Sequence, residues 1–285
     1  MRRPAPRRRS PGLANGSLRI GLFLTLAIAA MAVLAQVWTP YDAIDQDIPA
    51  KLQAPSWEHW LGTDHYGRDL LSRMMVGAGN ALLVGIVAVG LGLGAGVVLG
   101  ALAAAYRGWL DELLSRLSDV IFAFPAVLSA VLITASYGPG AVNAIVAIGI
   151  FNVPVFARVT RNAALQAWGR DYTRAALALG RSPLSVTLRH VLPNIVSLLI
   201  VQATIQFAVA ILAEAALSFL GLGVQPPEPT WGRMLFDSLT YMYVQPTLAI
   251  FPGLAIVLAV LGLNLLGDGL RDLFDPRSRR GRLAL

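Results

Sequence analysis

Long apolar runs alternate with short polar segments along most of the 285-residue chain. Six of these runs are long enough to cross a bilayer as helices, since one crossing takes about 20 residues. The pattern therefore predicts an all-α polytopic membrane protein with six transmembrane helices. The predicted spans are 19–37, 81–104, 118–136, 141–158, 195–217 and 247–266.

The polar segments divide the chain into a tail, an outer segment and a membrane core. The first residues carry arginines among prolines and glycines, a composition typical of a disordered tail. The first apolar run lacks a clear small-x-small cleavage site, so we expect an uncleaved span rather than a signal peptide. The predicted parts are a basic cytoplasmic tail at 1–18, the first transmembrane helix at 19–37, an extracytoplasmic segment at 38–80, a core of five helices at 81–268 and a basic cytoplasmic tail at 269–285.

Prolines and glycines mark special positions within the spans. The sequence Tyr-Gly-Pro-Gly at 137–140 predicts a tight turn that joins the third and fourth spans as a helical hairpin. Pro125 and Pro154 each interrupt the helical hydrogen bonding inside a span, which makes them candidates for pathway or gating positions. The second span contains several small-xxx-small glycine pairs, and such pairs predict close packing on a neighbouring helix.

Arginine placement predicts the orientation of the spans. When the segments are numbered alternately from an inner amino end, nineteen of the 23 cationic residues fall in inner segments. Cytoplasmic loops carry an excess of Lys and Arg, so both termini and the 171–194 segment are predicted to be cytoplasmic. The four outer cations are Lys51, Arg68, Arg73 and Arg233.

The inner segment 171–194 is too polar and too interrupted to cross a bilayer, yet it is patterned. Gly180 supplies a left-handed residue that ends a first helix, and Ser182-Pro183 starts a second one. Pro193 is predicted to punctuate the start of the next span. We therefore expect two short helices joined at a glycine, with small residues that allow close approach of another protein. One helical face of the first helix is predicted from Tyr172, Ala175, Ala176 and Leu179.

Composition excludes several kinds of chemistry. The chain is 56% apolar and has no cysteine, which excludes disulfides and thiolate sites. Its net charge of +7 is explained by arginines that flank spans rather than by a nucleic-acid site. The only lysine, Lys51, lacks the glycine pattern of a nucleotide-binding loop, so we expect no nucleotide hydrolysis by this chain. His65 beside Asp64 and Asp69 indicates a hydrogen-bonded loop more strongly than a metal site.

Apart from residues at the inner ends of spans, Glu214 is the one ionisable residue inside a predicted span, and one carboxylate gives little support for a proton-coupled carrier. Its position leaves two interpretations open, a residue lining an outward-facing vestibule or one that completes a helix packing contact. Trp231, in the proline-rich outer segment, is predicted to anchor at the membrane interface. The remaining function classes are a passive channel, a secondary carrier and the membrane half of a motor driven by a separate chain. The docking-type segment at 171–194 favours the motor.

The 171–194 segment resembles the EAA coupling loop of ABC importer permeases. The match comprises Ala175, Ala176 and Gly180, followed after the characteristic gap by Leu192-Pro193. Arg174 departs from the pattern, because the family usually has a glutamate there. The residues that this resemblance assigns to the contact with an ATPase are Tyr172, Arg174, Ala175, Ala176, Leu179, Gly180, His190, Leu192 and Pro193.

Other motifs are similar to the second, or "C", permease subunit of the dipeptide, oligopeptide and nickel importers, over residues 20–275. They are Leu61-Gly62-Thr63-Asp64 through Leu70, Asp119 with Pro125, Ala157-Arg158 with Arg161, and Glu214 through Leu235.

This resemblance implies a type I ABC importer permease fold in a bacterial inner membrane. It implies a homologous second permease, two ATPase domains that bind ATP and Mg²⁺, and an extracytoplasmic solute-binding protein as partners. Import of di- or oligopeptides is expected, with nickel, glutathione or another small solute as alternatives. No cofactor, metal or catalytic residue is expected on this chain itself.

Overall fold

The structure, a computed structural model, describes residues 11–274, and the regular elements within them are all helices. Five helical segments are long and apolar enough to cross a membrane, and a bent pair of shorter helices brings the number to six. The long helices are α1 (Pro11–Leu34), α2 (Leu70–Tyr106), α5 (Ala141–Trp168), α8 (Leu192–Phe219) and α10 (Thr247–Phe274). The shorter ones are α3 (Gly108–Ala123), α4 (Ala126–Tyr137), α6 (Asp171–Ala178), α7 (Pro183–Val186) and α9 (Trp231–Ser238), with a 3₁₀ turn η1 (Ile48–Ala50) and a π turn η2 (Thr187–Val191).

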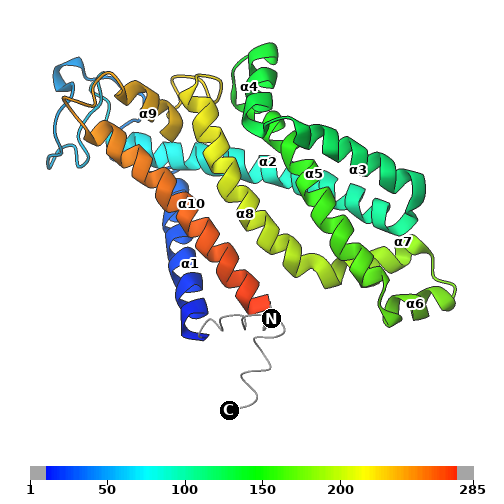
Figure 1. Ribbon diagram of the computed structural model, residues 1–285. Helices are drawn as coiled ribbons and strands as arrows, with labels where there is room; N and C mark the ends of the chain where they lie inside the picture. The colour runs from blue at the N-terminus through cyan, green and yellow to red at the C-terminus, as the bar shows by residue number, and fades with distance from the viewer. Residues whose placement is uncertain (1–10, 275–285) are drawn as a thin grey trace, which may run out of the picture.

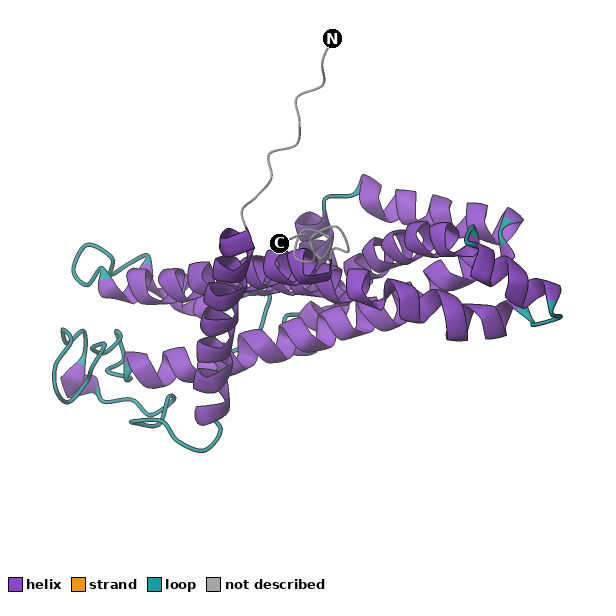
Figure 2. Ribbon diagram, turned by 90° about the horizontal axis from the view of Figure 1, so that it is seen from below, coloured by secondary structure: helices purple, strands orange, loops and turns teal. Residues whose placement is uncertain are grey.

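The helices run between two ends of the molecule, as Figure 1 shows. One end holds the beginning of α1, the end of α10, and α6 with α7. The opposite end holds the loop that follows α1, together with α9. Figure 2, seen from below, shows the longest loops gathered at one end of an elongated helical body. This arrangement agrees with the predicted topology, in which 171–194 and the outer segments lie on opposite sides of the membrane.

The third span is not the straight helix predicted at 118–136. It consists of α3 and α4, whose axes differ by 84°. The bend lies at Phe124 and Pro125, where Phe124 has extended backbone angles. A residue before proline is pushed out of the helical region by the proline ring, so the helix must end there. Pro125 therefore precedes a new helix rather than interrupting a continuous one.

Several helices extend beyond their predicted boundaries. α1 begins at Pro11, so residues 11–18 are helical rather than a disordered tail; residues 1–10 lie outside the described part. α2 begins at Leu70, eleven residues before the predicted span. Asp69 caps it, its carboxylate accepting a hydrogen bond of 2.7 Å from the Ser72 N–H. α10 extends to Phe274, into the predicted tail at 269–285.

The glycines of α2 pack closely on α5 and α8, as the sequence predicts. A Cβ atom at Gly92 would lie 2.2 Å from the Asn152 Cβ, and one at Gly96 would lie 2.6 Å from the Phe156 Cβ. Gly90 and Gly94, on another side of the same helix, have no neighbouring atom within 4 Å. α2 therefore uses one stripe of glycines for its internal contacts and leaves a second stripe open.

Trp231 does not anchor at the membrane interface as predicted. It is 1% exposed, and its indole N–H donates a 3.1 Å hydrogen bond to the Met74 carbonyl of α2. The side chain belongs to an apolar core that α1, α2, α8, α9 and α10 share. A second core lies between α2, α5 and α8, and a third joins α2 and α5 to the 171–194 segment.

Candidate coupling site

The 171–194 segment folds as two helices around a glycine. Gly180 has a φ of +79°, in the left-handed region where a side chain is strained. Its N–H and that of Arg181 donate to the carbonyls of Leu177 and Ala176, which ends α6. Ser182 then caps α7, its hydroxyl accepting from the Ser185 N–H, and Pro183 occupies the first turn. The local signals in the sequence thus produce the geometry that they predict.

The predicted face of α6 is divided between buried and exposed residues. Ala176 is buried in the core that also contains Val186 and Trp168. Thr173 is fully buried and donates from its hydroxyl to the Arg170 carbonyl at 2.6 Å. Ala175, in contrast, is exposed. Ala176 therefore holds α6 against its own chain, and Ala175 is the small residue that a partner can approach.

Large apolar side chains project from this segment. Leu179 is 82% exposed, and Leu184 and Leu188 are each more than half exposed. Tyr172 is 43% exposed, on the same side of α6 as Leu179. Clustered apolar side chains on an otherwise polar segment mark an interaction surface. We call Tyr172, Leu179, Leu184 and Leu188 the apolar patch.

The second half of the segment is continuous with a membrane helix. α7, the π turn η2 and α8 form one helical segment, Pro183–Phe219. Pro193 therefore lies within this segment and does not separate a loop from a span as predicted, because the π turn accommodates the missing N–H. Leu192 is half-buried against the third core. The His190 ring lies 6.5 Å from that of Tyr172, which links the π turn to α6.

Exposed arginines accompany the apolar patch along this segment. Arg170, Arg174, Arg181 and Arg189 are all exposed, and we call them the cationic rim. None of the ion pairs among the described residues involves any of the four. Asp171 is the single acidic residue of the 171–194 segment. The segment therefore exposes a net positive charge beside its apolar side chains.

The predicted pathway positions lie apart from this surface. Glu214 is 1% exposed on α8 and accepts a 2.6 Å hydrogen bond from the Ser218 hydroxyl. This burial favours a helix packing contact over an open vestibule. Pro154 is buried inside α5, and Pro125 is exposed at the start of α4. The structure thus brings together the coupling residues but not Glu214, Pro125 and Pro154.

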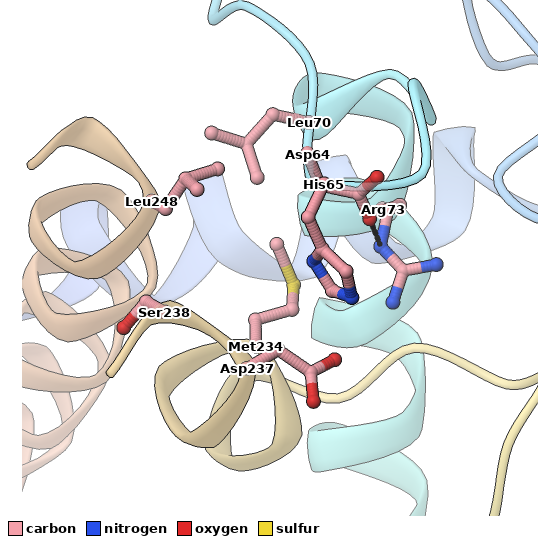
Figure 3. A pocket seen from close by; sticks show the side chains of 8 residues that line it. All are labelled: Asp64, His65, Leu70, Arg73, Met234, Asp237, Ser238 and Leu248. Atoms are coloured by element: carbon pink, nitrogen blue, oxygen red, sulfur yellow. Dashed lines mark ion pairs between the residues drawn. The ribbon is translucent and has the colours of Figure 1, made fainter. Parts of the chain in front are cut away.

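The hydrogen-bonded loop predicted around Asp64 occurs at the outer end, where Asp64 accepts from the Tyr66 and Arg68 N–H groups, and it also contains ion pairs that were not predicted. The Asp64 carboxylate pairs with the guanidinium groups of Arg68 at 2.7 Å and Arg73 at 3.5 Å. Figure 3 shows Asp64 and Arg73 beside His65, facing Met234 and Asp237 of α9. The Asp64 carboxylate is thus shared between two of the four outer cations and ties the outer loop to the first turns of α2. No group of three metal-ligating side chains occurs among residues 11–274.

Three further polar contacts join the helices. Arg161 of α5 makes a bidentate ion pair with Asp111 of α3, and Arg158 pairs with Asp119 at 2.5 Å. The amide of Gln206 on α8 donates to the Asn152 side chain of α5 at 2.8 Å. Arg158, Arg161 and Asp119 stood out in the sequence as motif residues, but nothing in the sequence indicated their pairing.

Comparison with known proteins identifies relatives that cover most of the chain. Residues 96–280 match a family described as the inner membrane component of binding-protein-dependent transport systems. The chain is 44% identical to a glutathione transport system permease protein of Pectobacterium atrosepticum, over 90% of this chain and 85% of that one. It is 42% identical to a dipeptide transport system permease protein of Alkalihalophilus pseudofirmus, over 91% of this chain and 86% of that one.

The fold is also similar to that of a solved structure. A chain of the inward-facing MetNI methionine ABC transporter matches with a TM-score of 0.59. The match covers 70% of this chain and 95% of that one, at 20% sequence identity. At this level of identity, the likeness concerns the arrangement of helices alone.

Proposed function

The chain belongs to the family of inner-membrane components of binding-protein-dependent transport systems, and on this premise we propose that residues 171–194 transmit the movement of ATPase subunits to its membrane helices. The chain is thus the multi-pass permease subunit of an ABC importer. Family membership also decides against the passive channel and the secondary carrier that the sequence leaves open.

One observation carries the coupling proposal. The apolar patch is exposed at the inner end of the molecule, on a segment that α7 and the π turn join directly to α8. An ATPase that binds the patch therefore contacts a helical segment that continues into the membrane helix α8. ATP and Mg²⁺ bind to the ATPase subunits in this proposal, and the permease contributes only the mechanical contact.

The proposed assembly contains a second, homologous permease subunit, two ATPase domains and a solute-binding protein. The binding protein delivers substrate at the outer end, where the loop before α2 and α9 lie. The two permeases enclose the translocation pathway between them. Closure of the ATPases around ATP moves the coupling segments and opens the pathway outward, and hydrolysis resets it.

Short peptides are the proposed substrate class. The relatives are named for dipeptide and glutathione transport, and both solutes carry amide bonds with charged ends. Nickel is the alternative. Isolation of the cognate binding protein and identification of its ligand by mass spectrometry and metal analysis distinguishes the two. A bound peptide supports the proposal, and stoichiometric nickel without peptide contradicts it.

Substitutions at Gly180 and Ala175 test the coupling proposal. Gly180→Val places a β-branched residue at a φ of +79° in open space, so it strains the turn without a clash. The strain costs about 1–2 kcal/mol. Ala175→Trp covers the exposed small residue. We expect both variants to lose transport and transporter-stimulated ATP hydrolysis in the reconstituted importer, and Ala175→Trp to weaken ATPase binding as well.

Two matched substitutions serve as controls for this test. Gly169→Val introduces the same side chain at a glycine with right-handed angles, where Cβ contacts lie at 3.5 Å or more. Ala54→Trp introduces the same bulk in the exposed outer loop. Gly169→Val should retain coupling, and Ala54→Trp, at the opposite end of the molecule from the coupling segment, should retain ATPase binding. Unchanged transport, ATPase binding and hydrolysis in Gly180→Val and Ala175→Trp would refute the proposed role of the segment.

A further inference from the structure

The cationic rim has no partner within the described part of the chain. Its four arginines are exposed, and none of them makes an ion pair there. Two other exposed arginines of the inner half differ in this respect, because Arg116 pairs with Glu112 at 2.6 Å and Arg158 pairs with Asp119 at 2.5 Å. Arg19 and Arg107 are exposed and also make no ion pair in the described structure. The coupling segment is therefore distinguished by having four such arginines within residues 170–189.

The charges are placed unfavourably for an isolated helix. Arg170 and Arg174 lie one turn apart at the amino-terminal end of α6, where cations oppose both each other and the helix dipole. Asp171, Ala175 and Ala178 form the outermost stripe of α6, with these arginines on one side and Tyr172 and Leu179 on the other. A surface that approaches the alanine stripe thus meets positive charge along one edge and apolar side chains along the other.

We propose that the coupling segment is recognised by an ATPase cleft whose rim is acidic, with carboxylates facing Arg170 and Arg174 and an apolar socket that receives Leu179. This inference rests on the proposed function and adds the chemistry of the partner surface. Charge complementarity favours it, because residues 170–194 contain four arginines and one acidic residue. Carboxylates opposite the guanidinium groups also relieve the repulsion within α6.

Charge reversal in the full importer tests the acidic rim. The purified permease pair is combined with its own ATPase subunits in lipid nanodiscs, and binding is measured from low to high salt. We expect Arg174→Glu to weaken ATPase binding by about tenfold or more at low salt, since each 1.4 kcal/mol is a tenfold change. The Arg170→Glu/Arg174→Glu variant should bind still more weakly. Arg170→Gln/Arg174→Gln should flatten the salt dependence of binding.

A matched control and a compensating substitution on the ATPase show whether the loss of binding comes from the proposed charge contact. Arg271→Glu reverses an exposed cation at the inner end of α10 and should leave binding unchanged. Conversely, a lysine in place of a rim carboxylate of the ATPase should restore binding to Arg174→Glu. Nanodiscs of neutral lipid and of lipid with anionic headgroups are compared in parallel. An effect confined to anionic lipid would overturn the proposal, because it would assign the arginines to the bilayer surface.

The outcome also separates this inference from the coupling proposal. Normal ATPase binding by both charge-reversal variants, together with loss of coupling in Gly180→Val, would refute the acidic rim and leave the coupling role intact. If Gly180→Val and Ala175→Trp also behave as wild type, the coupling role itself fails. Weakened binding by the charge variants with restoration by the complementary lysine supports both.

Discussion

The imidazole of His65 is enclosed at the outer end between α2, α9 and the turn after α9. It stacks on Tyr241 with the ring centres 5.0 Å apart, and its Nδ1 atom is buried without a hydrogen-bond partner in the described structure. Burial lowers the pKa of His65 below its ordinary value of 6.5, and Arg68 and Arg73 lower it further. The carboxylates of Asp64 and Asp237 oppose the shift without reversing it.

This lowered pKa predicts a loss of stability in acid. The folded protein binds fewer protons at His65 than the unfolded chain, so stability falls as the pH drops below about 6.5. We expect the thermal unfolding midpoint of the purified permease to decrease between pH 7.5 and pH 5.5. His65→Gln should show a smaller decrease over that range, whereas His190→Gln, on the other side of the membrane, should keep it. An identical dependence of the unfolding midpoint on pH for His65→Gln and wild type would show that His65 does not cause the loss of stability in acid.

At the scale of elements, the two glycine stripes of α2 provide a matched comparison. Gly92→Ala and Gly96→Ala place a methyl group within 2.6 Å or less of α5, and such overpacking costs about 1–3 kcal/mol. Gly90→Ala and Gly94→Ala meet nothing within 4 Å, so they should leave the isolated chain as stable or about 0.5–1 kcal/mol more stable. Thermal unfolding in detergent measures the difference. Equal destabilisation at all four positions would contradict the observed packing.

The elements that the sequence predicts well are those specified by neighbouring residues. The turn at 137–140 and the α6–Gly180–α7 unit depend on caps and glycines a few positions apart, and both occur as expected. The start of α2 could not be located from hydropathy, because Arg73 is neutralised by Asp64 and also donates to the Ala43 carbonyl. The burial of Trp231 was also not predicted, because its hydrogen-bond partner Met74 lies 157 residues earlier in the chain. Contacts between residues so far apart along the chain leave no periodic pattern in a single sequence.

At the scale of the whole molecule, the absence of cysteine permits a direct test of sidedness. Trp57, in the outer loop, is 97% exposed, and Leu179, in the coupling segment, is 82% exposed. Single Trp57→Cys and Leu179→Cys variants therefore report on opposite ends. A membrane-impermeant maleimide should label Trp57→Cys in intact cells and Leu179→Cys only after permeabilisation. The ATPase subunits should protect Leu179→Cys, and labelling of that variant in intact cells would reverse the topology.

The unbroken run from Pro183 to Phe219 gives this permease a lever arm. At 1.5 Å per residue, its 37 residues extend about 55 Å, from beside the apolar patch to beyond Glu214. A rigid rod of that length, tilted about one end, shifts its other end by about 1 Å for each degree. A small rocking of Leu184 and Leu188 by the ATPases would therefore reach the outer packing of Glu214 and Ser218 through the π turn and α8, as a displacement that grows along the helix.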